Sequence, residues 1–479
     1  MKLNRRQFLS TAATLTAGFT IVPAYAVSGL GHKAPSDKLN IAGIGVGGKG
    51  AVNLRNMNTE NIVALCDVDF NYARNTFNEY PNAKRFFDFR EMLDISGKEI
   101  DAVVIATPDH THAVAAIACM QLGKHVYVQK PLTHSVYESR QLLLASRKYK
   151  VVTQMGNEGH SDDSVREVYE AIHAGAIGDV YHCDAWTDRP IWPQGLSAPK
   201  DTMPVPENMR WDLFIGPAQM RPYHRAYHPW DWRGWWDFGT GALGDMACHV
   251  LDVLVYVLDP GHPVSVEASS TAINTQGAPV ASTIHYEFPA RKKAKKINMP
   301  PLTVTWYDGG LLPKRPEGLP DGQMINIGSN GVIFHGTKGT LICDNYGANW
   351  TLLPYSGNEK NRPSFPKTQR RIGMSHEQDF VRACKESPAN RVLPSSNFEY
   401  SGPLNEMVVM GNLAIRLQGL GKRLMWDGEA MKITNIGDSE TFRIANGSPE
   451  GERTLTLNAK EAAEEYINHH YREGWSLTF

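Results

Sequence analysis

The chain has 479 residues, with 49 Lys and Arg against 50 Asp and Glu, so its formal net charge is −1. This balance excludes the basic surface that is typical of a protein binding a nucleic-acid backbone. Hydrophobic residues make up 42% of the chain and charged residues 21%, which is the composition of a globular protein rather than a disordered one. The six cysteines are scattered and form no C-x-x-C pair, so they predict buried apolar side chains and no disulfide framework.

The first 26 residues are typical of a twin-arginine signal peptide. Arg5 and Arg6 precede a short apolar stretch over residues 11–22, and Ala24-Tyr25-Ala26 has the small residues of a cleavage site. The apolar stretch is too short to anchor the chain across a membrane core of about 30 Å. We therefore predict export by the twin-arginine machinery to the periplasm or cell envelope of a Gram-negative bacterium, with residues 27–38 as a linker. Because this route carries folded proteins, it also favours a cofactor bound before export.

A strand, a glycine turn and a helix follow one another from residue 39. Residues 39–44 predict the strand, residues 45–50 the turn and residues 51–57 the helix. In this order the glycines let the backbone approach a pyrophosphate, which N–H groups at the helix start bind. A second predicted strand ends at Asp67, twenty residues after Gly47, where a carboxylate binds ribose hydroxyls and repels a 2′-phosphate. The pattern predicts NAD rather than NADP, bound at Gly45, Gly47, Gly48, Gly50 and Asp67.

Strand and helix patterns alternate up to residue 155. Residues 101–107, 125–128 and 151–155 are typical of strands, and residues 111–122 and 134–149 of helices. The alternation predicts an α/β fold whose N-terminal Rossmann domain, residues 39–155, contains a doubly wound parallel sheet. The carboxyl ends of such strands line the ligand crevice, which predicts further cofactor contacts at Thr107, Pro108, His110, His112, Gln129, Lys130 and Asn157. The alternative is a doubly wound sheet whose glycine turn binds no nucleotide.

Four stretches of sequence carry a resemblance to a known family. They are the turn at residues 45–50, Ala106-Thr107-Pro108-Asp109-His110-Thr111-His112, residues 123–131 ending in Gln129-Lys130-Pro131, and Gly244-Asp245-Met246-Ala247-Cys248-His249. With these the chain resembles the Gfo/Idh/MocA oxidoreductases, a superfamily of sugar and cyclitol dehydrogenases. The resemblance implies that Lys130 belongs to a Glu-Lys-Pro motif and contacts both nicotinamide and substrate, with Asp245 and His249 across the cofactor. Gln129 departs from the family, in which Glu is usual.

Asp245 and His249 are four residues apart, so they share one face if residues 243–256 form a helix. A histidine suits the base that takes the hydroxyl proton when a secondary alcohol is oxidised. The alternative is that Asp245 caps the helix and His249 is an ordinary helix residue, and Lys130 by itself fits a solvated surface lysine. As catalytic residues we expect Lys130 to orient the alcohol, His249 to act as base and Asp245 to position it.

Seven of the 11 tryptophans fall between Trp186 and Trp236. Aromatic rings interleaved with charged groups suit a sugar, whose C–H faces pack on rings and whose hydroxyls bond to polar side chains. The same composition fits an interdomain or subunit interface, and we expect a homo-oligomer. His224 and His228 have the spacing of two metal ligands, but prolines flank them, so we predict no metal. The predicted substrate contacts are Lys130, Tyr223, Trp230, Trp232, Arg233, Trp235, Asp245 and His249.

The second domain, residues 156–430, is predicted to be α+β with an open, mostly antiparallel sheet, and residues 431–479 a C-terminal extension. Strands are expected at residues 179–186, 264–273, 281–288, 302–307, 331–335 and 340–343. Helices are expected at residues 376–385 and 402–417. The Gly- and Pro-rich residues 308–321 are expected to form a loop that covers the cleft.

The predicted reaction and the predicted location have to agree. The cell envelope has no maintained nicotinamide pool, so an exported enzyme must keep its cofactor bound and recycle it in place. NAD-dependent oxidation of a ring hydroxyl of a sugar or glycoside meets this condition if the same cofactor then reduces a second acceptor, and this is our prediction.

Two other hypotheses stay open. In a redox-neutral glycosidase, transient oxidation acidifies the neighbouring C–H, a base such as His249 or Tyr223 removes that proton, the glycosidic group leaves and hydride returns. Retention of Lys130-Pro131 favours the dehydrogenase over this scheme, because the family members that resemble it usually lack the lysine motif. The other hypothesis is a sugar-binding protein without turnover.

Overall fold

The computed structural model describes residues 37–294, 297–325, 329–354 and 363–478, so the predicted signal peptide and most of the predicted linker lie outside the described residues. Six parallel strands form the N-terminal sheet, in the order β3-β2-β1-β4-β5-β6. The strands are β1 (Asn40–Ile44), β2 (Asn61–Cys66), β3 (Lys84–Phe86), β4 (Ala102–Ile105), β5 (His125–Val128) and β6 (Thr153–Met155). The helices between them are α3 (Lys49–Asn56), α4 (Arg74–Glu79), α5 (Phe89–Ser96), α6 (His112–Gln121) and α7 (Val136–Tyr149). The predicted doubly wound parallel sheet is confirmed.

Local sequence explains why these elements form where they do. β4 is buried along its whole length, so it is a continuous apolar run rather than an alternating pattern. α7 begins at a capping box in which the Ser135 side chain accepts from the Glu138 N–H. It ends at Tyr149, and the next residue, Lys150, has a φ of 53° and caps it. The predicted helix at residues 134–149 is therefore confirmed, with its start moved two residues by the cap.

The second sheet has nine strands in the order β15-β14-β13-β7-β12-β9-β8-β16-β17. All the described pairs in it are antiparallel except β7 with β12, so the predicted mostly antiparallel sheet is confirmed. The strands are β7 (Val180–Thr187), β8 (Ser265–Ser270), β9 (Ser282–Phe288), β12 (Leu302–Tyr307), β13 (Asn330–Gly336), β14 (Gly339–Cys343), β15 (Thr351–Leu353), β16 (Leu424–Asp427) and β17 (Lys432–Ile433). Two hairpins lie outside it: β10 (Arg291–Ala294) with β11 (Ile297–Met299), and β18 (Thr441–Ala445) with β19 (Thr454–Asn458).

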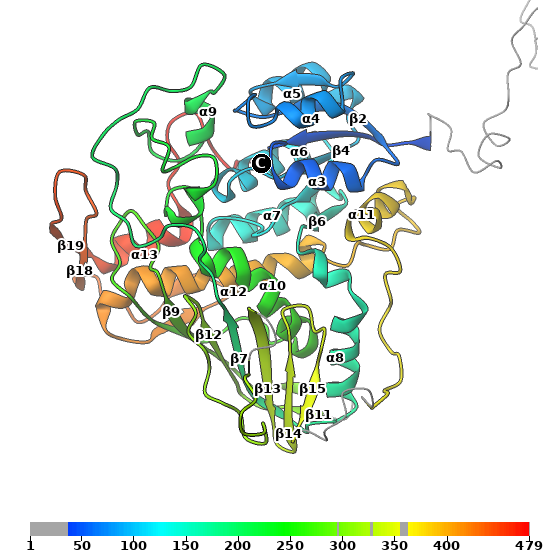
Figure 1. The fold of residues 1–479 in the computed structure, drawn as a ribbon, viewed down its shortest axis with the longest axis vertical. Helices are drawn as coiled ribbons and strands as arrows, with labels where there is room; N and C mark the ends of the chain where they lie inside the picture. Colours follow the sequence, from blue (N-terminus) through cyan, green and yellow to red (C-terminus); the bar gives the residue numbers. More distant parts are fainter. Residues whose placement is uncertain (1–36, 295–296, 326–328, 355–362, 479) are drawn as a thin grey trace, which may run out of the picture.

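The helices α7, α10 (Gly241–Leu258) and α12 (Phe398–Leu417) lie between the two sheets. The remaining helices are α8 (Asp163–His173), α9 (Trp211–Ile215), α11 (His376–Lys385) and α13 (Ala459–Asn468). α12 packs against α7 of the Rossmann domain and against β8 and β9 of the second sheet, while α10 packs against β7 and β13 (Figure 1). One continuous hydrophobic core cluster therefore includes side chains of both domains.

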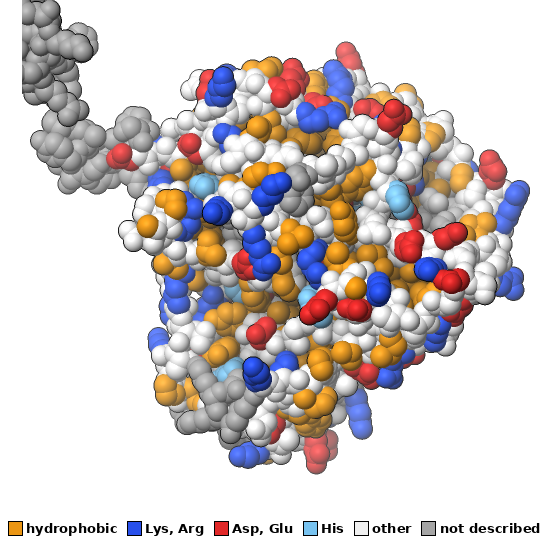
Figure 2. Space-filling view, turned by 180° about the vertical axis from the view of Figure 1, so that it is seen from behind, with side chains coloured by type: hydrophobic (Ala, Val, Ile, Leu, Met, Phe, Trp, Pro, Cys, Tyr) orange, Lys and Arg blue, Asp and Glu red, His pale blue; other side chains and the backbone are white. Residues whose placement is uncertain are grey.

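α10 is long and apolar enough to span a membrane, but 83% of its apolar window is buried inside the molecule. All six cysteines are buried, as predicted. On the face seen in Figure 2, acidic and basic side chains are interspersed, in keeping with the balanced net charge.

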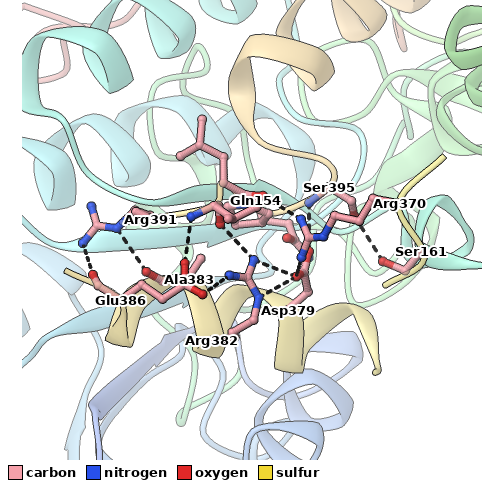
Figure 3. Close-up of polar contacts among 12 residues, drawn as sticks. Gln154, Ser161, Arg370, Asp379, Arg382, Ala383, Glu386, Arg391 and Ser395 are labelled. Carbon is pink, nitrogen blue, oxygen red and sulfur yellow. Dashed lines mark hydrogen bonds and ion pairs between the residues drawn. The ribbon is translucent and has the colours of Figure 1, made fainter. Parts of the chain in front are cut away.

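The chain returns from the second domain to complete the first. Phe380 and Val381 of α11 are buried against Leu65 and Tyr127 of the Rossmann sheet. Asp379 at the start of this helix accepts hydrogen bonds from Arg370, Arg382 and the Ser395 N–H, and Gln154 of β6 donates to a carbonyl of the same helix (Figure 3). The predicted boundary at residue 155 thus separates the two sheets, but the first domain also includes α11 from the later part of the chain.

Candidate active site

A cavity of about 670 Å³ runs along the carboxyl edge of the Rossmann sheet. It includes Asp67 after β2, Thr107 after β4, Lys130 after β5 and Gly156 after β6, so it follows the strand order across the sheet. This edge is where open parallel sheets bind their ligands. The volume of the cavity is typical of a site for an organic ligand. The second domain closes the other side of the cavity with α10 and the tryptophan-rich segment, residues 186–236.

The glycine turn is built for a close approach of the backbone. Gly45 has a φ of 76°, and a Cβ there would lie 2.6 Å from the Ala106 carbonyl oxygen. A Cβ on Gly50 would lie 2.1 Å from the Gly45 carbonyl oxygen, so Gly50 lets α3 pack on the turn. Gly45, Gly47 and Gly48 line the cavity, whereas Gly50 lies behind the turn and supports it.

Asp67 lies directly under this turn. Its Oδ2 atom accepts hydrogen bonds from the N–H groups of Val46 at 2.8 Å and Gly47 at 3.0 Å. Burial raises the pKa of Asp67 to about 6, and the backbone hydrogen bonds oppose that rise. The carboxylate is ionised at neutral pH and lines the cavity, where it can accept hydrogen bonds from a ribose and repel a phosphate.

Two features of the cavity fit NAD. Thr107 lines it with a buried hydroxyl that has no partner among the described residues, so a polar group of a ligand can supply one. The turn offers a close approach to its backbone, with no room for side chains, and Asp67 offers a carboxylate at the place where a dinucleotide lies in this fold. Gly45, Gly47, Gly48 and Asp67 would therefore hold the adenosine diphosphate part of the cofactor.

Lys130, Asp245 and Arg233 form a charged cluster at the other end. Lys130 Nζ lies 2.9 Å from Asp245 Oδ1, and Arg233 Nε lies 3.2 Å from the same oxygen. Burial alone would raise the pKa of Asp245, but the two cations outweigh it and lower that pKa to about 2. Burial alone would lower the pKa of Lys130, but Asp245 outweighs it and raises that pKa, so Lys130 stays a hydrogen-bond donor. The sequence placed Lys130 and Asp245 near one another only by resemblance, and Arg233 was predicted as a substrate contact from its place in the tryptophan-rich segment.

His249 lies four residues from Asp245 on α10 and lines the same cavity. Burial lowers its pKa to about 3, and the charge of Lys130 adds to this effect, so the imidazole is neutral. The hydroxyl of Tyr346 lies 3.0 Å from His249 Nδ1. In the tautomer whose Nδ1–H donates to Tyr346, the Nε2 lone pair can accept a proton. Asp245 therefore contacts Lys130 and Arg233 rather than the imidazole, which Tyr346 holds instead.

Part of the tryptophan-rich segment lines the cavity. The Arg233 guanidinium carbon lies 4.4 Å from the ring centroid of Trp230 and 4.3 Å from that of Trp232. Trp192 also faces the cavity, and Trp230 is 48% exposed. Flat rings beside a cluster of charged donors and acceptors can hold a sugar ring by its C–H face and its hydroxyls.

The structure does not bring every predicted residue to the cavity. Both ring nitrogens of His110 and of His112 face main-chain carbonyl oxygens, so these two are buried structural groups. Asn157 is buried, accepts a hydrogen bond from Ser396 and does not line the cavity, but its Nδ2 has no partner among the described residues. Tyr223 and Trp235 do not line the cavity; they pack in the aromatic cluster around Trp211 and Phe238, which reaches the cavity through Trp232. None of the residues 308–321 lines the cavity; Leu319 packs on the far face of the second sheet instead, so the cleft-covering loop was a wrong expectation. The cavity does contain Pro108, Gln129, Trp230 and Trp232.

Sequence reasoning missed several cavity residues. Tyr346 follows β14 and carries no sequence signal, since its partner His249 is 97 residues away. Tyr72 covers the glycine turn, where a Cβ on Gly47 would lie 2.1 Å from its ring. Glu158 and Lys49 also line the cavity, where they form an ion pair at 2.6 Å. Of the residues that were missed, only Lys49 could have been predicted from the sequence, because it lies inside the glycine turn.

The structure accounts for Gln129. Its Nε2 atom donates to Asn53 Oδ1 at 2.8 Å, while Asn53 Nδ2 donates to Glu377 at 2.9 Å and to Glu158 at 3.3 Å. Asn53 thus presents its oxygen to position 129 because its nitrogen is already used by two carboxylates. Position 129 therefore needs a neutral side chain that can donate a hydrogen bond, as Gln does, whereas an ionised Glu there would add a third carboxylate and could not donate.

Gln129→Glu is therefore expected to destabilise the protein, by about 2–3 kcal/mol at neutral pH, because it buries a charge against an acceptor. Gln129→Met removes the hydrogen bond without adding charge and should cost less. Because the introduced carboxyl group can donate to Asn53 once it is protonated, the penalty of Gln129→Glu should shrink as the pH falls, whereas that of Gln129→Met should not. Urea unfolding of both variants at two pH values measures this, and equal penalties at both pH values would contradict it.

Sequence comparisons agree with this architecture. Residues 39–157 match the model of an oxidoreductase family with an NAD-binding Rossmann fold, and residues 188–292 match that of the C-terminal α/β domain of an oxidoreductase family. The levoglucosan dehydrogenase of Pseudarthrobacter phenanthrenivorans is 24% identical over 58% of this chain and 63% of its own length. A glycosyl hydrolase family 109 protein of Shewanella pealeana is 29% identical over 39% of this chain and 46% of its own length. The matches thus span about half the length of these relatives.

The fold is also similar to solved structures. The WlbA dehydrogenase from Bordetella pertussis, in complex with NADH and UDP-GlcNAcA, aligns with a TM-score of 0.54 at 16% identity, over 81% of this chain and 99% of that one. Likeness at this identity concerns the fold alone. The two domain matches show that residues 39–157 carry an NAD-binding Rossmann domain and residues 188–292 a C-terminal α/β domain of the Gfo/Idh/MocA oxidoreductase type.

Proposed function

We propose that the protein is an NAD-dependent dehydrogenase that oxidises a ring hydroxyl of a sugar or glycoside. The observation that carries the proposal is the grouping of a cationic Lys130, an ionised Asp245 and a neutral His249 at one end of the cavity, beside Trp230 and Trp232. The levoglucosan dehydrogenase relative supports a sugar-type substrate.

The residues of this chain have distinct tasks in the reaction. The aromatic rings and Arg233 hold the sugar, and Lys130 donates a hydrogen bond to the hydroxyl oxygen that is to be oxidised. Asp245 keeps Lys130 charged and fixes its position. His249 takes the hydroxyl proton at Nε2, while Tyr346 fixes its ring. When bound, NAD supplies the acceptor for the hydride that leaves the same carbon.

We also propose that the enzyme is exported and keeps its cofactor bound between turnovers. The twin-arginine pattern at Arg5 and Arg6 supports export. Cofactor retention is supported by contacts between the tryptophan-rich segment and residues 67–72, which lie at the ribose end of the cavity. The Phe70 N–H donates to the Asn208 carbonyl, the Arg210 N–H donates to the Val68 carbonyl, and His228 lies 2.9 Å from Asp69. These contacts have to open before a dinucleotide can leave.

His228→Ala is expected to speed NAD dissociation by roughly tenfold or more, because it removes a hydrogen bond to a charged group from the contact that covers the ribose end. Burial alone would raise the pKa of Asp69, but His228 and the backbone N–H groups of Tyr72 and Asn71 together outweigh it and lower that pKa. Release is measured by stopped-flow displacement of reduced cofactor. His224→Ala is the matched control, since His224 pairs at 3.5 Å with an exposed Asp201. Equal release rates in both variants would count against a closing role for the segment.

The proposed activity is tested on purified protein. Mass spectrometry of the small molecules released by denaturation identifies the bound cofactor, and we expect NAD. Incubation with aldoses, cyclitols and the anhydrosugar levoglucosan is followed by the absorbance of the reduced nicotinamide. If a sugar binds in calorimetry but causes no absorbance change, the protein is a non-catalytic sugar-binding protein and not a dehydrogenase.

A second candidate is a redox-neutral glycosidase, which the glycosyl hydrolase family 109 relative favours. Both reactions begin with the same oxidation, so the cavity residues keep their tasks. An artificial electron acceptor separates them, because accumulation of a keto-sugar requires the acceptor and cleavage of a glycoside does not. The lysine motif at Lys130-Pro131 supports the dehydrogenase.

A further inference from the structure

Three potential metal ligands meet on the face of the second sheet that points away from α10. Along β7, Cys183 and Ala185 belong to the core, so the alternating residues His182 and Asp184 lie on the opposite face. On the neighbouring strand β13, His335 pairs directly with His182. The position of the three residues therefore follows from the strand register alone.

The side chains converge on one point. His182 Nε2 lies 3.1 Å from Asp184 Oδ1, and His335 Nε2 lies 2.9 Å from Asp184 Oδ2. One ligand atom from each residue lies within 4.8 Å of the others. Ligands of a tetrahedral ion bound at about 2.0–2.2 Å are separated by somewhat more than 3 Å. Each imidazole nitrogen already lies close to that distance from one of the two Asp184 oxygens.

Neighbouring groups hold two of these ligands in place. His182 Nδ1 lies 2.7 Å from the Thr303 hydroxyl on β12, which leaves Nε2 facing Asp184. The Tyr307 hydroxyl donates to Asp184 at 3.3 Å. Protein metal sites use such outer contacts to fix the orientation of their ligands. The Asp184 side chain is only 7% exposed, so the carboxylate is held rather than solvated.

We propose that His182, Asp184 and His335 bind one divalent transition-metal ion, with zinc as the best fit. Two imidazole nitrogens and one carboxylate oxygen are a donor set that zinc accepts, and water completes the coordination. His182 also lines a cavity of about 380 Å³ on this face, which gives water access to the ion. Because two of the ligands lie on β7 and the third on β13, the ion connects these two strands on the outer face of the sheet. This site goes beyond the proposed dehydrogenase activity and departs from the sequence expectation of no metal.

The test uses tag-free full-length protein, freed of metal by EDTA and titrated with Co²⁺ and Zn²⁺. We expect one equivalent of Co²⁺ to give the visible absorbance of a low-symmetry nitrogen and oxygen site, and Zn²⁺ to displace it. His182→Gln and His335→Gln should each weaken binding by at least about 100-fold, and Thr303→Val by about tenfold, since loss of an outer contact costs that much or more.

His285→Gln is the matched control. His285 is exposed on the same face of the sheet and contacts Thr305, not the three ligands. It should bind metal as the wild type does. The proposal is overturned if the metal-free wild type takes up no stoichiometric Co²⁺ or Zn²⁺, or if His285→Gln lowers uptake as much as the ligand variants do. Because the readout is metal uptake, it is independent of whether the protein oxidises sugars.

Discussion

Lys130→Met is expected to lower kcat/KM for the sugar by about 10²–10³-fold, the usual cost of removing one donor from a developing alkoxide. The loss should fall mainly on kcat, because Lys130 interacts most strongly with the oxygen as it loses its proton. The variant should fold, since Asp245 keeps its contact with Arg233 at 3.2 Å. Reduction of the bound nicotinamide in a single turnover measures the effect.

Lys124→Met is the control for this experiment. Lys124 precedes the opposite end of β5 and donates to the Ile100 carbonyl, away from the cavity. It should retain wild-type kcat/KM and NAD content. If Lys130→Met keeps the bound NAD and still reduces it at more than a third of the wild-type rate, Lys130 is a structural residue and the mechanism is wrong.

His249→Gln is expected to lower kcat by about 10²–10⁴-fold, because an amide can keep the contact with Tyr346 but cannot take a proton. NAD and sugar affinities should change little. The same exchange at His285, on the far face of the second sheet, should leave kcat unchanged. Single-turnover rates together with sugar affinity from calorimetry separate the loss of the base from a loss of binding.

The pH profile supplies an independent check of this assignment. Burial lowers the pKa of His249 to about 3, so the imidazole does not titrate near neutral pH and stays neutral there. The wild-type rate should therefore show no acid limb from His249 near neutrality. Tyr346→Phe removes the partner of Nδ1 and should lower kcat without changing the sugar's dissociation constant. A His249→Gln enzyme that keeps the wild-type rate would assign the proton transfer to another group.

Short-range signals explain what could be predicted. The glycine turn, the strands of the first sheet and the capped helix α7 depend on residues close together in sequence, so periodicity and turn chemistry suffice to find them. α12 shows the limit, because the helix was expected to begin at residue 402, whereas Asn397 caps it and it begins at the buried Phe398. α8 was not predicted, although it is regular and amphipathic.

The candidate site was predicted in part for the same reason. Gly45, Gly47 and Asp67 follow from local order and spacing, and Lys130 follows from its place after a strand. His110 and His112 were predicted as cofactor contacts because they follow a strand end as well, yet their rings turn inward to backbone carbonyls. A strand end indicates the edge at which a residue lies but not the direction of its side chain.

The sequence by itself predicted the parallel sheet from its alternating strand and helix patterns, and the dinucleotide turn and the acidic residue after β2 from their order and a spacing of about twenty residues. Only the tertiary structure decided which tryptophans face the cavity, that Tyr346 holds His249, and that His335 meets His182 and Asp184. These contacts join segments separated by many residues, and their geometry is set by how sheets and helices pack, which local periodicity does not encode.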